Sequence, residues 1–408
     1  MLGGLGVGAG VTVTTLLAFE LSGSAALAGI AASASAFGAG VSAAVIGALS
    51  RHGRRPGLVG GYVVGLVGAS TAVVSAVLGA FPMMVAATFL FGASNASNLQ
   101  ARYAATDLAS PDRKGSDLSV VVWATTVGAV LGPNLTGPGV AAAELIGVPV
   151  LAGPYLLSAA GFAAAALVLL IGLRPDPLLL ARELLETQSV REDEPTMTVP
   201  QRGALATGLA AVSADASARA AVVTIASAHA VMVGVMVMTP VHMGHHGADV
   251  RIIGLTISLH ILGMYAFSPV FGRLSDRFGA RPVLALGLLQ LLAAVALSAL
   301  STPQGGAGFV GGLLLLGTGW SAALIASSAL LTTSLPLDAR APAQGLSDLA
   351  MNVAGGSAGA LSGLVMTLLG FPLMAATTVL LLLAPAAMVL ADARRPRAAE
   401  PGPLASTP

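Results

Sequence analysis

Residues 252–301 decide the fold of this chain. They read IIGLTISLHILGMYAFSPVF (252–271), then the basic decapeptide GRLSDRFGAR (272–281), then PVLALGLLQLLAAVALSALS (282–301). An apolar run of about twenty residues is long enough to cross a bilayer as an α-helix. A short arginine-rich loop between two such runs is typical of a helical hairpin whose loop faces the cytoplasm.

The composition of the whole chain is that of a membrane protein. The 408 residues are 55% hydrophobic and 9% charged, with a mean hydropathy of +0.87, whereas soluble domains carry about 25% charged residues. Strand-like alternation is absent, so helices rather than a barrel are expected to span the membrane. The chain has no cysteine, which excludes disulfides, zinc–thiolate sites and iron–sulfur clusters. Its one lysine, Lys114, follows no glycine-rich loop, so we predict no Walker A site and no enzymatic activity.

Twelve apolar segments of spanning length are predicted, and one long polar segment separates the sixth from the seventh. The expected fold class is an all-α membrane protein with twelve transmembrane helices in two pseudo-symmetric six-helix halves. Its expected parts are an N-terminal half (1–173), a cytoplasmic linker with at most some amphipathic helix (174–219), a C-terminal half (220–392) and a cytoplasmic tail (393–408). The segments lie at roughly 1–21, 24–49, 58–80, 82–105, 117–139, 151–173, 220–242, 252–271, 282–301, 306–334, 343–369 and 372–391.

Basic residues fix the predicted orientation. With both termini cytoplasmic, every one of the 19 lysine and arginine residues except Arg102 and Arg251 falls in an inner loop, the linker or the tail. Because cytoplasmic loops carry an excess of such residues, we expect the chain in the cytoplasmic (inner) membrane with both ends inside. The expected partners are the lipid bilayer, a transported ion or small molecule and, if transport is coupled, protons. No nucleic-acid partner is predicted, and we expect a monomer.

Short sequences recur in the two halves. Residues 51–56 (RHGRRP) match residues 277–282 (RFGARP), and residues 116–118 (SDL) match residues 347–349 (SDL). The offsets are 277 − 51 = 226 and 347 − 116 = 231, and a small insertion reconciles them. Two parallel six-helix repeats joined by a polar linker are the build of a secondary transporter whose halves rock around a central site.

Two motifs carry a family resemblance. The loop GRLSDRFGAR (272–281) resembles, residue for residue, the loop signature of the major facilitator superfamily, although Ser50 stands where the first-half copy would have aspartate. In the fifth predicted helix, Gly128-x-x-x-Gly132-Pro133 is similar to the superfamily's antiporter motif. The resemblance covers nearly the whole chain and implies transport by alternating access. For the helix-five motif it implies a seal that sets the transport mode, with close helix packing and a bend as the alternative.

Two pairs of soft metal ligands lie at membrane depth. Met232 and Met236 in the seventh predicted helix, and His260 and Met264 in the eighth, each share one helix face at i,i+4 spacing. Thioether and imidazole groups suit Cu(I). In type, spacing and helix these residues resemble the CcoA-type copper importers, which implies copper as the transported substrate and no resident cofactor. The alternative is that the methionines fill gaps in the core and His260 hydrogen-bonds a neighbour.

Four further histidines accompany this set. His242, His245 and His246 lie at the predicted outer mouth, where they could collect metal, or form part of a hydrated loop without a special role. His229 lies one helical turn to the cytoplasmic side of Met232. It could act as an exit ligand or proton carrier, and a structural hydrogen bond is the alternative.

The basic loops predict a latch between the halves on the cytoplasmic side. We expect Asp276, Arg277 and Arg281 to form a charge cluster there. Asp117 and Asp348 open helices five and eleven, where the helix dipole favours a carboxylate, and the resemblance implies that each helix start faces the other half's loop. Because Ser50 cannot serve as an anion, Arg51 is predicted to pair with Asp348. The alternative is simple helix capping together with the charge bias of inner loops.

Helix four contributes candidate cavity residues. Asn95, Asn98 and Arg102 share one helix face, and a cation at this depth must face water or a partner. Arg102 could line the cavity or bind an anionic group, or make a structural contact with Asp107. Asp348 and Asn352, at i,i+4 spacing, could together bind a proton or a polar group of the cargo.

The function predicted from the sequence is that of a secondary transporter, and copper import is the leading interpretation of its cargo. The alternative is proton-coupled efflux of drugs or small organic molecules, which the antiporter-like motif favours. Uptake of a small organic nutrient, such as a vitamin, is a third reading. The sequence leaves the direction of transport and the coupling ion open.

Overall fold

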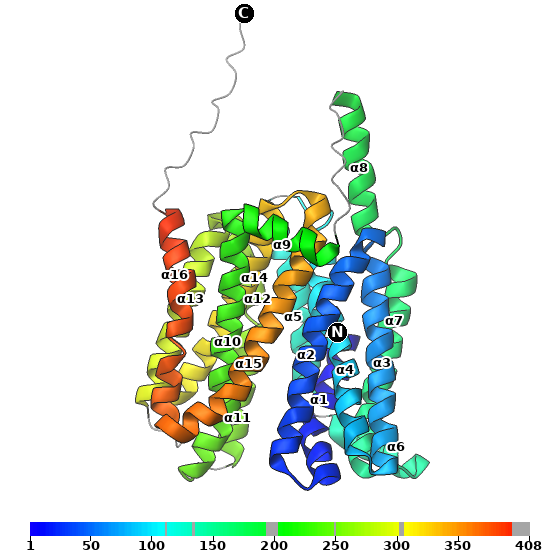
Figure 1. The fold of residues 1–408 in the computed structure, drawn as a ribbon, viewed down its shortest axis with the longest axis vertical. Helices are drawn as coiled ribbons and strands as arrows, with labels where there is room; N and C mark the ends of the chain where they lie inside the picture. Colours follow the sequence, from blue (N-terminus) through cyan, green and yellow to red (C-terminus); the bar gives the residue numbers. More distant parts are fainter. Residues whose placement is uncertain (111, 133–134, 193–202, 249, 302–305, 394–408) are drawn as a thin grey trace, which may run out of the picture.

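The computed structural model describes residues 1–110, 112–132, 135–192, 203–248, 250–301 and 306–393, which fold into a bundle of helices (Figure 1). The first half contains α1 (Leu2–Ser22), α2 (Ala25–Leu49), α3 (Arg54–Leu78), α4 (Phe81–Ala104), α5 (Lys114–Leu131), α6 (Thr136–Ile146) and α7 (Gly153–Gly172), with short 3-10 turns at Ser50–His52 and Val150–Ala152. Two helices follow in the linker, α8 (Pro177–Glu192) and α9 (Ala204–Ala214). The second half contains α10 (Ala216–His245), α11 (Val250–Tyr265), α12 (Ser268–Phe278), α13 (Ala280–Leu300), α14 (Ala307–Ser334), α15 (Leu337–Thr377) and α16 (Leu380–Ala393).

The predicted all-α fold class is confirmed. Within the described ranges, nine helical stretches are long and apolar enough to cross a membrane by length and composition, and each of the twelve predicted segments falls on helix. The fifth segment differs from its prediction, since α5 ends at Leu131 and α6 begins at Thr136. Between the eleventh and twelfth segments, α15 continues through a break at Gly370, whose φ of 75° lies in the left-handed region that glycine tolerates.

Local sequence signals account for the helix ends. The Ser24 hydroxyl accepts a hydrogen bond from the Leu27 N–H at the start of α2, and the Asp215 carboxylate accepts one from the Ala218 N–H at the start of α10. Such side chains satisfy backbone donors that a helix leaves unpaired at its first turn. Gly79 ends α3 in the left-handed conformation that is common after a helix.

The helices form two groups that pack against each other. Within the first group α3 packs on α4 and α7, and within the second α10 packs on α14 and α15. Two seams join the groups, one where α2 runs along α15 and one where α5 runs along α12. The linker helices α8 and α9 lie at one end of the bundle (Figure 1), which we call the linker end, and the opposite end is called the far end.

The α2–α15 seam is tightest toward the linker end. A Cβ atom added at Gly47 would lie 2.9 Å from the Gly345 Cα atom and 3.0 Å from the Ala341 carbonyl oxygen. Small residues allow helix backbones to approach this closely inside a membrane. The two helices run in opposite directions, and they diverge from this contact toward the far end (Figure 1).

Candidate functional site

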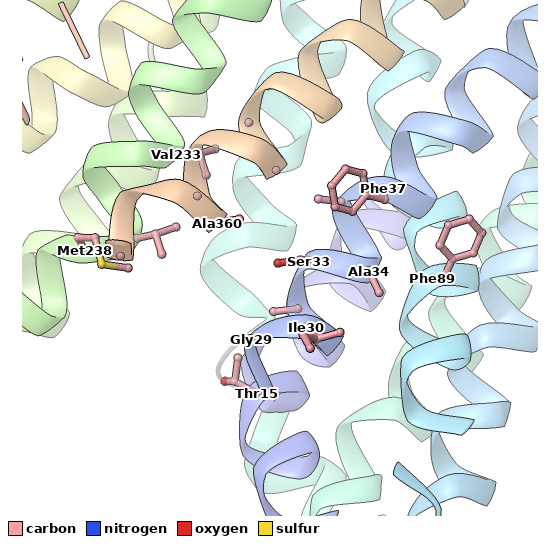
Figure 2. A pocket seen from close by; sticks show the side chains of 17 residues that line it. Thr15, Gly29, Ile30, Ser33, Ala34, Phe37, Phe89, Val233, Met238 and Ala360 are labelled. Atoms are coloured by element: carbon pink, nitrogen blue, oxygen red, sulfur yellow. The ribbon is translucent and has the colours of Figure 1, made fainter. Parts of the chain in front are cut away.

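A cavity of about 980 Å³ lies between the two halves, where α2 and α15 separate. Its walls come from α1, α2 and α4 of the first half and from α10 and α15 of the second (Figure 2). The lining is largely apolar, with Ile30 and Phe37 on one side and Val233, Val237 and Met238 on the other. This shape and chemistry can accept a bulky apolar molecule.

Glycines of α15 make room for this cavity. Gly355, Gly359 and Gly363 recur at i,i+4 spacing and all line it, so they share one face of the helix. A Cβ atom added at Gly359 would lie 3.1 Å from a Val233 methyl carbon on α10. A side chain on this face of α15 would therefore take up space that the cavity now occupies.

An aromatic group lies behind the cavity wall, next to Gly355. The Trp320 Nε1–H on α14 donates a hydrogen bond to His229 Nδ1 on α10, with 2.9 Å between the two nitrogens. The Tyr265 ring meets the Trp320 ring edge-on, with the ring centroids 5.8 Å apart. His229 in turn lies against Gly355, a lining residue. The structural hydrogen bond considered for His229 is thus present. His229 accepts it through Nδ1, one of its two ring nitrogens.

Buried charge crosses between the halves on the linker side of the cavity. Arg102 Nη2 on α4 lies 2.7 Å from Asp348 Oδ1 on α15, and the two side chains are 1% and 2% exposed. Arg102 also donates to the hydroxyls of Ser328 and Tyr103, at 3.2 Å and 2.8 Å. Ionisable groups in a membrane bundle are costly unless paired, so this pair favours the arrangement in which the two halves meet here.

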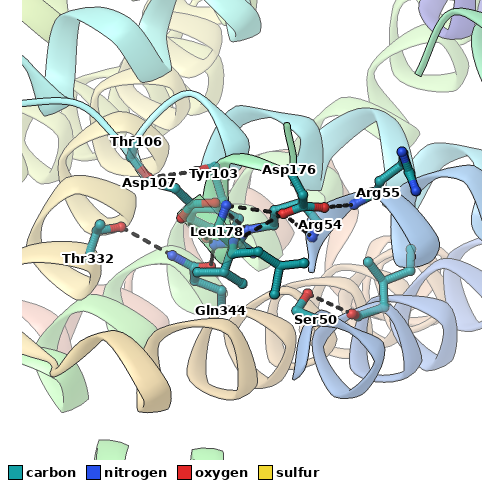
Figure 3. Close-up of polar contacts among 12 residues, drawn as sticks. Ser50, Arg54, Arg55, Tyr103, Thr106, Asp107, Asp176, Leu178, Thr332 and Gln344 are labelled. Carbon is teal, nitrogen blue, oxygen red and sulfur yellow. Dashed lines mark hydrogen bonds and ion pairs between the residues drawn. The ribbon is translucent and has the colours of Figure 1, made fainter. Parts of the chain in front are cut away.

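A second buried pair lies beside the first. Arg54 at the start of α3 makes a two-pronged contact with Asp107, at 2.7 Å and 2.9 Å (Figure 3). The same guanidinium donates to Gln344 Oε1 on α15 at 2.8 Å, and Gln344 donates onward to Thr332 at 3.3 Å. We call the two pairs, Arg54–Asp107 and Arg102–Asp348, the charge layer. The Arg102–Asp348 pair joins the two halves directly, whereas the Arg54–Asp107 pair lies within the first half and reaches the second through Gln344.

The other seam is closed by a carboxylate at a helix start. Asp276 at the end of α12 accepts hydrogen bonds from the backbone N–H groups of Gly115 and Ser116 in the first turn of α5, at 2.7 Å and 2.8 Å. These N–H groups have no partner within the helix, and the helix dipole favours an anion beside them. A Cβ atom added at Gly272 would lie 2.6 Å from the Gly115 carbonyl oxygen, so the two elements touch through their backbones.

The structure corrects the predicted pairing of charges. Asp348 pairs with Arg102 and not with Arg51, which is exposed and whose carbonyl oxygen accepts a hydrogen bond from Arg182 at 2.9 Å. The predicted alternative, a structural contact between Arg102 and Asp107, is also absent, because Asp107 pairs with Arg54. The helices α3, α4 and α15 are rotated about their axes so that these charged side chains face the interior. The periodicity of the sequence does not predict this rotation.

Two residues of the predicted charge cluster, Asp276 and Arg281, line the same pocket together with Lys114. Arg277 lies over the Phe278 ring at 5.2 Å, and Arg281 donates to the Ser217 hydroxyl at 3.1 Å. Asp117 lies 3.6 Å from Arg113 on the same exposed helix start. The Asp276 carboxylate reaches the other half, where it accepts hydrogen bonds from backbone N–H groups of α5.

The predicted copper ligands lie in the packed interior of the second half. Met232 and Met264 belong to its buried apolar cluster, and Met236 packs against that cluster. His260 is fully buried, and its Nδ1 lies 2.9 Å from the Leu313 carbonyl oxygen of α14. None of these four residues is among those that line the cavity.

The predicted metal relay is divided between two places. His242 stacks flat on the Phe371 ring, with centroids 4.2 Å apart, and meets His246 edge-on at 4.5 Å. His245 is exposed. These three lie at the far end of α10, whereas His229 lies deeper, beside Trp320.

The candidate cavity residues of helix four lie away from the cavity wall. Asn98 accepts a hydrogen bond from the Tyr62 hydroxyl at 3.4 Å, and neither it nor Asn95 lines the described cavity. Asn352 is buried and donates to the Asp348 carbonyl oxygen at 2.8 Å, one turn before the first lining glycine of α15.

The glycines of the helix-five motif pack α5 onto α1. A Cβ atom added at Gly132 would lie 2.7 Å from the Gly8 carbonyl carbon, and one added at Gly128 would lie 2.7 Å from the Gly4 Cα atom. Close packing, the predicted alternative to a seal, is therefore visible for both glycines. Pro133 lies outside the described residues.

Two features of this region were missed by sequence reasoning. In the sequence, Arg54 is one of several loop arginines and nothing distinguishes it. Its hydrogen bond to Gln344 is visible only in the structure. The bond between His229 and Trp320 had a weak signal, because a buried tryptophan N–H usually finds an acceptor and the chain has only two tryptophans.

Comparison with known proteins agrees with this architecture. The sequence profile of the Major Facilitator Superfamily matches residues 1–249 and residues 220–408. A relative in Bacillus subtilis (strain 168), the uncharacterized MFS-type transporter YddS, is 40% identical over 364 residues, which are 89% of this chain and 82% of YddS. The riboflavin transporter RfnT of Brucella anthropi is 32% identical over 294 residues, 71% of this chain and 68% of RfnT.

Solved structures show the same fold. The human organic anion transporter MFSD10 superimposes with a TM-score of 0.73 at 17% identity, covering 95% of this chain and 98% of MFSD10. With a family profile that matches both halves and relatives that cover most of the chain, this multi-pass membrane protein is a secondary transporter and belongs to the major facilitator superfamily.

Proposed function

We propose that this transporter moves a small organic molecule with a large apolar surface, bound in the cavity between α2 and α15. The cavity carries the proposal: it measures about 980 Å³ and its walls are largely apolar. Sites for organic ligands commonly measure about 300–1,000 Å³ and are lined mainly by apolar side chains. A metal ion needs a few convergent ligand atoms instead, and Met238 is the one thioether in this described lining.

The positive-inside rule supports an orientation for the bundle. Arginines gather at the linker end, for example Arg54 and Arg113, and cytoplasmic loops carry an excess of such residues. We therefore propose that the linker end faces the cytoplasm across the cytoplasmic membrane, in keeping with the orientation expected from the basic residues. In that orientation the charge layer and the Asp276 contact close the cytoplasmic side, while the cavity belongs to the outer side. The structure would then represent the outward-facing state of an alternating-access cycle.

The relatives suggest which cargo to try first. RfnT is named a riboflavin transporter, and riboflavin combines a flat tricyclic ring with a polar chain. A flat ring of that size suits a cavity bordered by Phe37 and Phe89, since aromatic groups stack on one another. Riboflavin is therefore the first probe, and it also represents the nutrient-uptake alternative.

Copper import is the second candidate, and one observation favours it. His260 Nε2 is buried and has no hydrogen-bond partner within the described structure, so this imidazole nitrogen is free to bind a metal. Met264 follows one helical turn later and is 8% exposed. Against copper stands the position of both residues inside the packed second half, away from the cavity.

A transport assay with three labelled probes separates these candidates. Membrane vesicles of both orientations would carry the wild type or the Gly363→Trp variant, and would be given riboflavin, the lipophilic drug ethidium or Cu(I). We expect riboflavin or ethidium to accumulate at least threefold above the Gly363→Trp vesicles, whose cavity is filled. Repeating the assay after collapse of the proton gradient shows whether protons drive transport.

Two outcomes would contradict the organic-cargo proposal. Accumulation of copper that His260→Ala abolishes and Gly363→Trp leaves unchanged would establish the second candidate. Organic probes that accumulate equally with wild type and with Gly363→Trp would show that the cavity does not bind cargo.

A further inference from the structure

His229 lies directly behind Gly355, a residue that lines the cavity. On α10 it precedes Val233 and Val237 by one and two helical turns, so the three side chains follow one helix face. The two valines line the cavity. His229 therefore lies one helical turn beyond the last valine of the cavity wall on α10.

The position of the imidazole proton follows from its partner. An indole N–H can only donate, so His229 Nδ1 must accept the 2.9 Å hydrogen bond from Trp320 Nε1. The neutral ring then carries its proton on Nε2. Trp320 is 1% exposed and is held in place by the edge-on Tyr265 ring. The acceptor side of His229 is thus fixed by a rigid neighbour, and its donor side is free for another partner.

The donor side of the ring is directed at the cavity wall. A Cβ atom added at Gly355 would lie 2.8 Å from His229 Nε2 and still closer to Cδ2, so the ring edge rests on this glycine. Gly355 itself lines the cavity. His229 is partly exposed, in contrast to the fully buried His260, whose Nε2 is enclosed without a partner. The absence of a side chain at residue 355 lets the Nε2 edge of His229 pack against a residue that lines the cavity.

We propose that His229 is the polar anchor of the cargo site, donating a hydrogen bond from Nε2 to an acceptor atom of the cargo. This inference rests on the proposed organic cargo and narrows it to flat or apolar molecules that carry a carbonyl oxygen or ring nitrogen at one end. The apolar walls hold the body of the molecule, and His229 fixes which end points to the middle of the bundle. A buried donor of this kind discriminates against analogues that lack the acceptor, because binding them leaves the N–H unpaired.

A matched pair of ligands tests this role. Fluorenone and fluorene are flat tricyclic molecules of nearly equal size, and only fluorenone has a carbonyl oxygen. Their binding to the full-length protein in lipid nanodiscs can be followed through Trp320 fluorescence in a Trp123→Phe background, which leaves a single tryptophan in the chain. Wild-type protein is expected to bind fluorenone about tenfold more tightly than fluorene, the ratio that one hydrogen bond of ordinary strength gives.

Two substitutions separate the two ring nitrogens. His229→Asn keeps an acceptor near the Nδ1 position for Trp320 but removes the donor at Nε2. It should weaken fluorenone binding about tenfold and leave fluorene binding within twofold. His229→Gln places an amide N–H near the Nε2 position and should restore most of the preference for fluorenone.

The outcomes distinguish this inference from the proposed function. If both ligands bind and His229→Asn weakens them equally, or weakens neither, the anchor role is overturned while the cavity remains a cargo site. If neither ligand binds wild-type protein and Gly363→Trp has no effect on transport of organic probes, the proposed function fails and the anchor role fails with it.

Discussion

Asp348 and Arg102 are a buried ion pair whose partners come from different halves of the molecule, at 2% and 1% exposure. Desolvation makes such a pair a modest net contributor to stability, but removing one partner leaves the other charge buried and unpaired. The pair therefore favours one arrangement of the two halves. The buried Arg102 charge is stable only while the Asp348 carboxylate of α15 lies against it.

We predict that Asp348→Asn destabilises the arrangement closed at the linker end by about 3–5 kcal/mol, because the Arg102 charge loses its counter-ion. The double variant Arg102→Gln with Asp348→Asn should recover most of that loss. Thermal unfolding of the purified single and double variants measures both effects. Equal losses in the two variants would show that the ion pair does not govern the closed arrangement.

A second residue-scale prediction concerns Asp276. Asp276→Asn keeps the size of the side chain but removes the negative charge beside the first turn of α5, where the carboxylate accepts from Gly115 and Ser116. We expect a loss of about 0.5–2 kcal/mol in unfolding free energy, the usual range for a helix cap. Arg277→Gln, whose side chain lies over the neighbouring Phe278 ring, is the matched control and should cost less. A greater loss for the control would contradict the assignment.

At the scale of elements, α15 combines a tight contact with a wide gap. Near the linker end Gly345 brings its backbone against α2, and farther along Gly359 and Gly363 hold the cavity open. The glycines of this one helix thus have two roles. Gly345 allows close contact with α2, whereas Gly359 and Gly363 leave space for the cavity.

We predict that Gly363→Leu reduces transport of the organic cargo at least tenfold without a large loss of stability. An added Cβ atom there meets only Met238, at 3.9 Å, so the leucine fills the cavity with little strain on the helix. Gly60→Leu on α3 is the control, since a Cβ atom at Gly60 has no neighbour within 4 Å and lies outside the cavity lining. Transport rates at equal protein amounts decide, and equal rates in the two variants would contradict a cargo role for the cavity.

The elements show how far sequence reasoning reaches. Spanning helices follow from apolar length, and for this reason all twelve predicted segments fall on helix. The fifth segment was predicted as one span from its apolar length, although Gly132 and Pro133, where a bend was considered, directly follow the end of α5 at Leu131. The charge pairs were also missed, since the partner of Asp348 depends on how α4 and α15 are rotated, which the sequence pattern does not fix. The cavity lies along glycines 355, 359 and 363 of α15, and its place opposite α2 is visible only after the halves are assembled.

At the scale of the whole molecule, the two ends of the seam differ in accessibility. Ser33 borders the cavity, whereas Ala341 is 1% exposed beside the tight α2–α15 contact. The chain has no cysteine, so single cysteines can be introduced without background. These two positions therefore report separately on the cavity and on the closed end.

We predict that Ser33→Cys reacts with a membrane-impermeant thiol reagent added outside intact cells, and that Ala341→Cys does not react from either side. Adding Asp348→Asn to Ala341→Cys should increase labelling from the cytoplasmic side at least fivefold, because the closed end is weakened. Labelling of Ser33→Cys from the cytoplasmic side alone would reverse the proposed orientation of the bundle.

The charge layer has a further consequence for the energy of the cycle. The charges of its two arginines and two aspartates sum to zero, and each cation lies against its own anion. A membrane potential acts on net displaced charge, at about 2.3 kcal/mol per elementary charge for each 100 mV. If each pair travels as a neutral unit, the voltage does no work on this layer when the empty carrier reorients. Any voltage dependence of transport would then report the charge of the cargo and its co-transported ions.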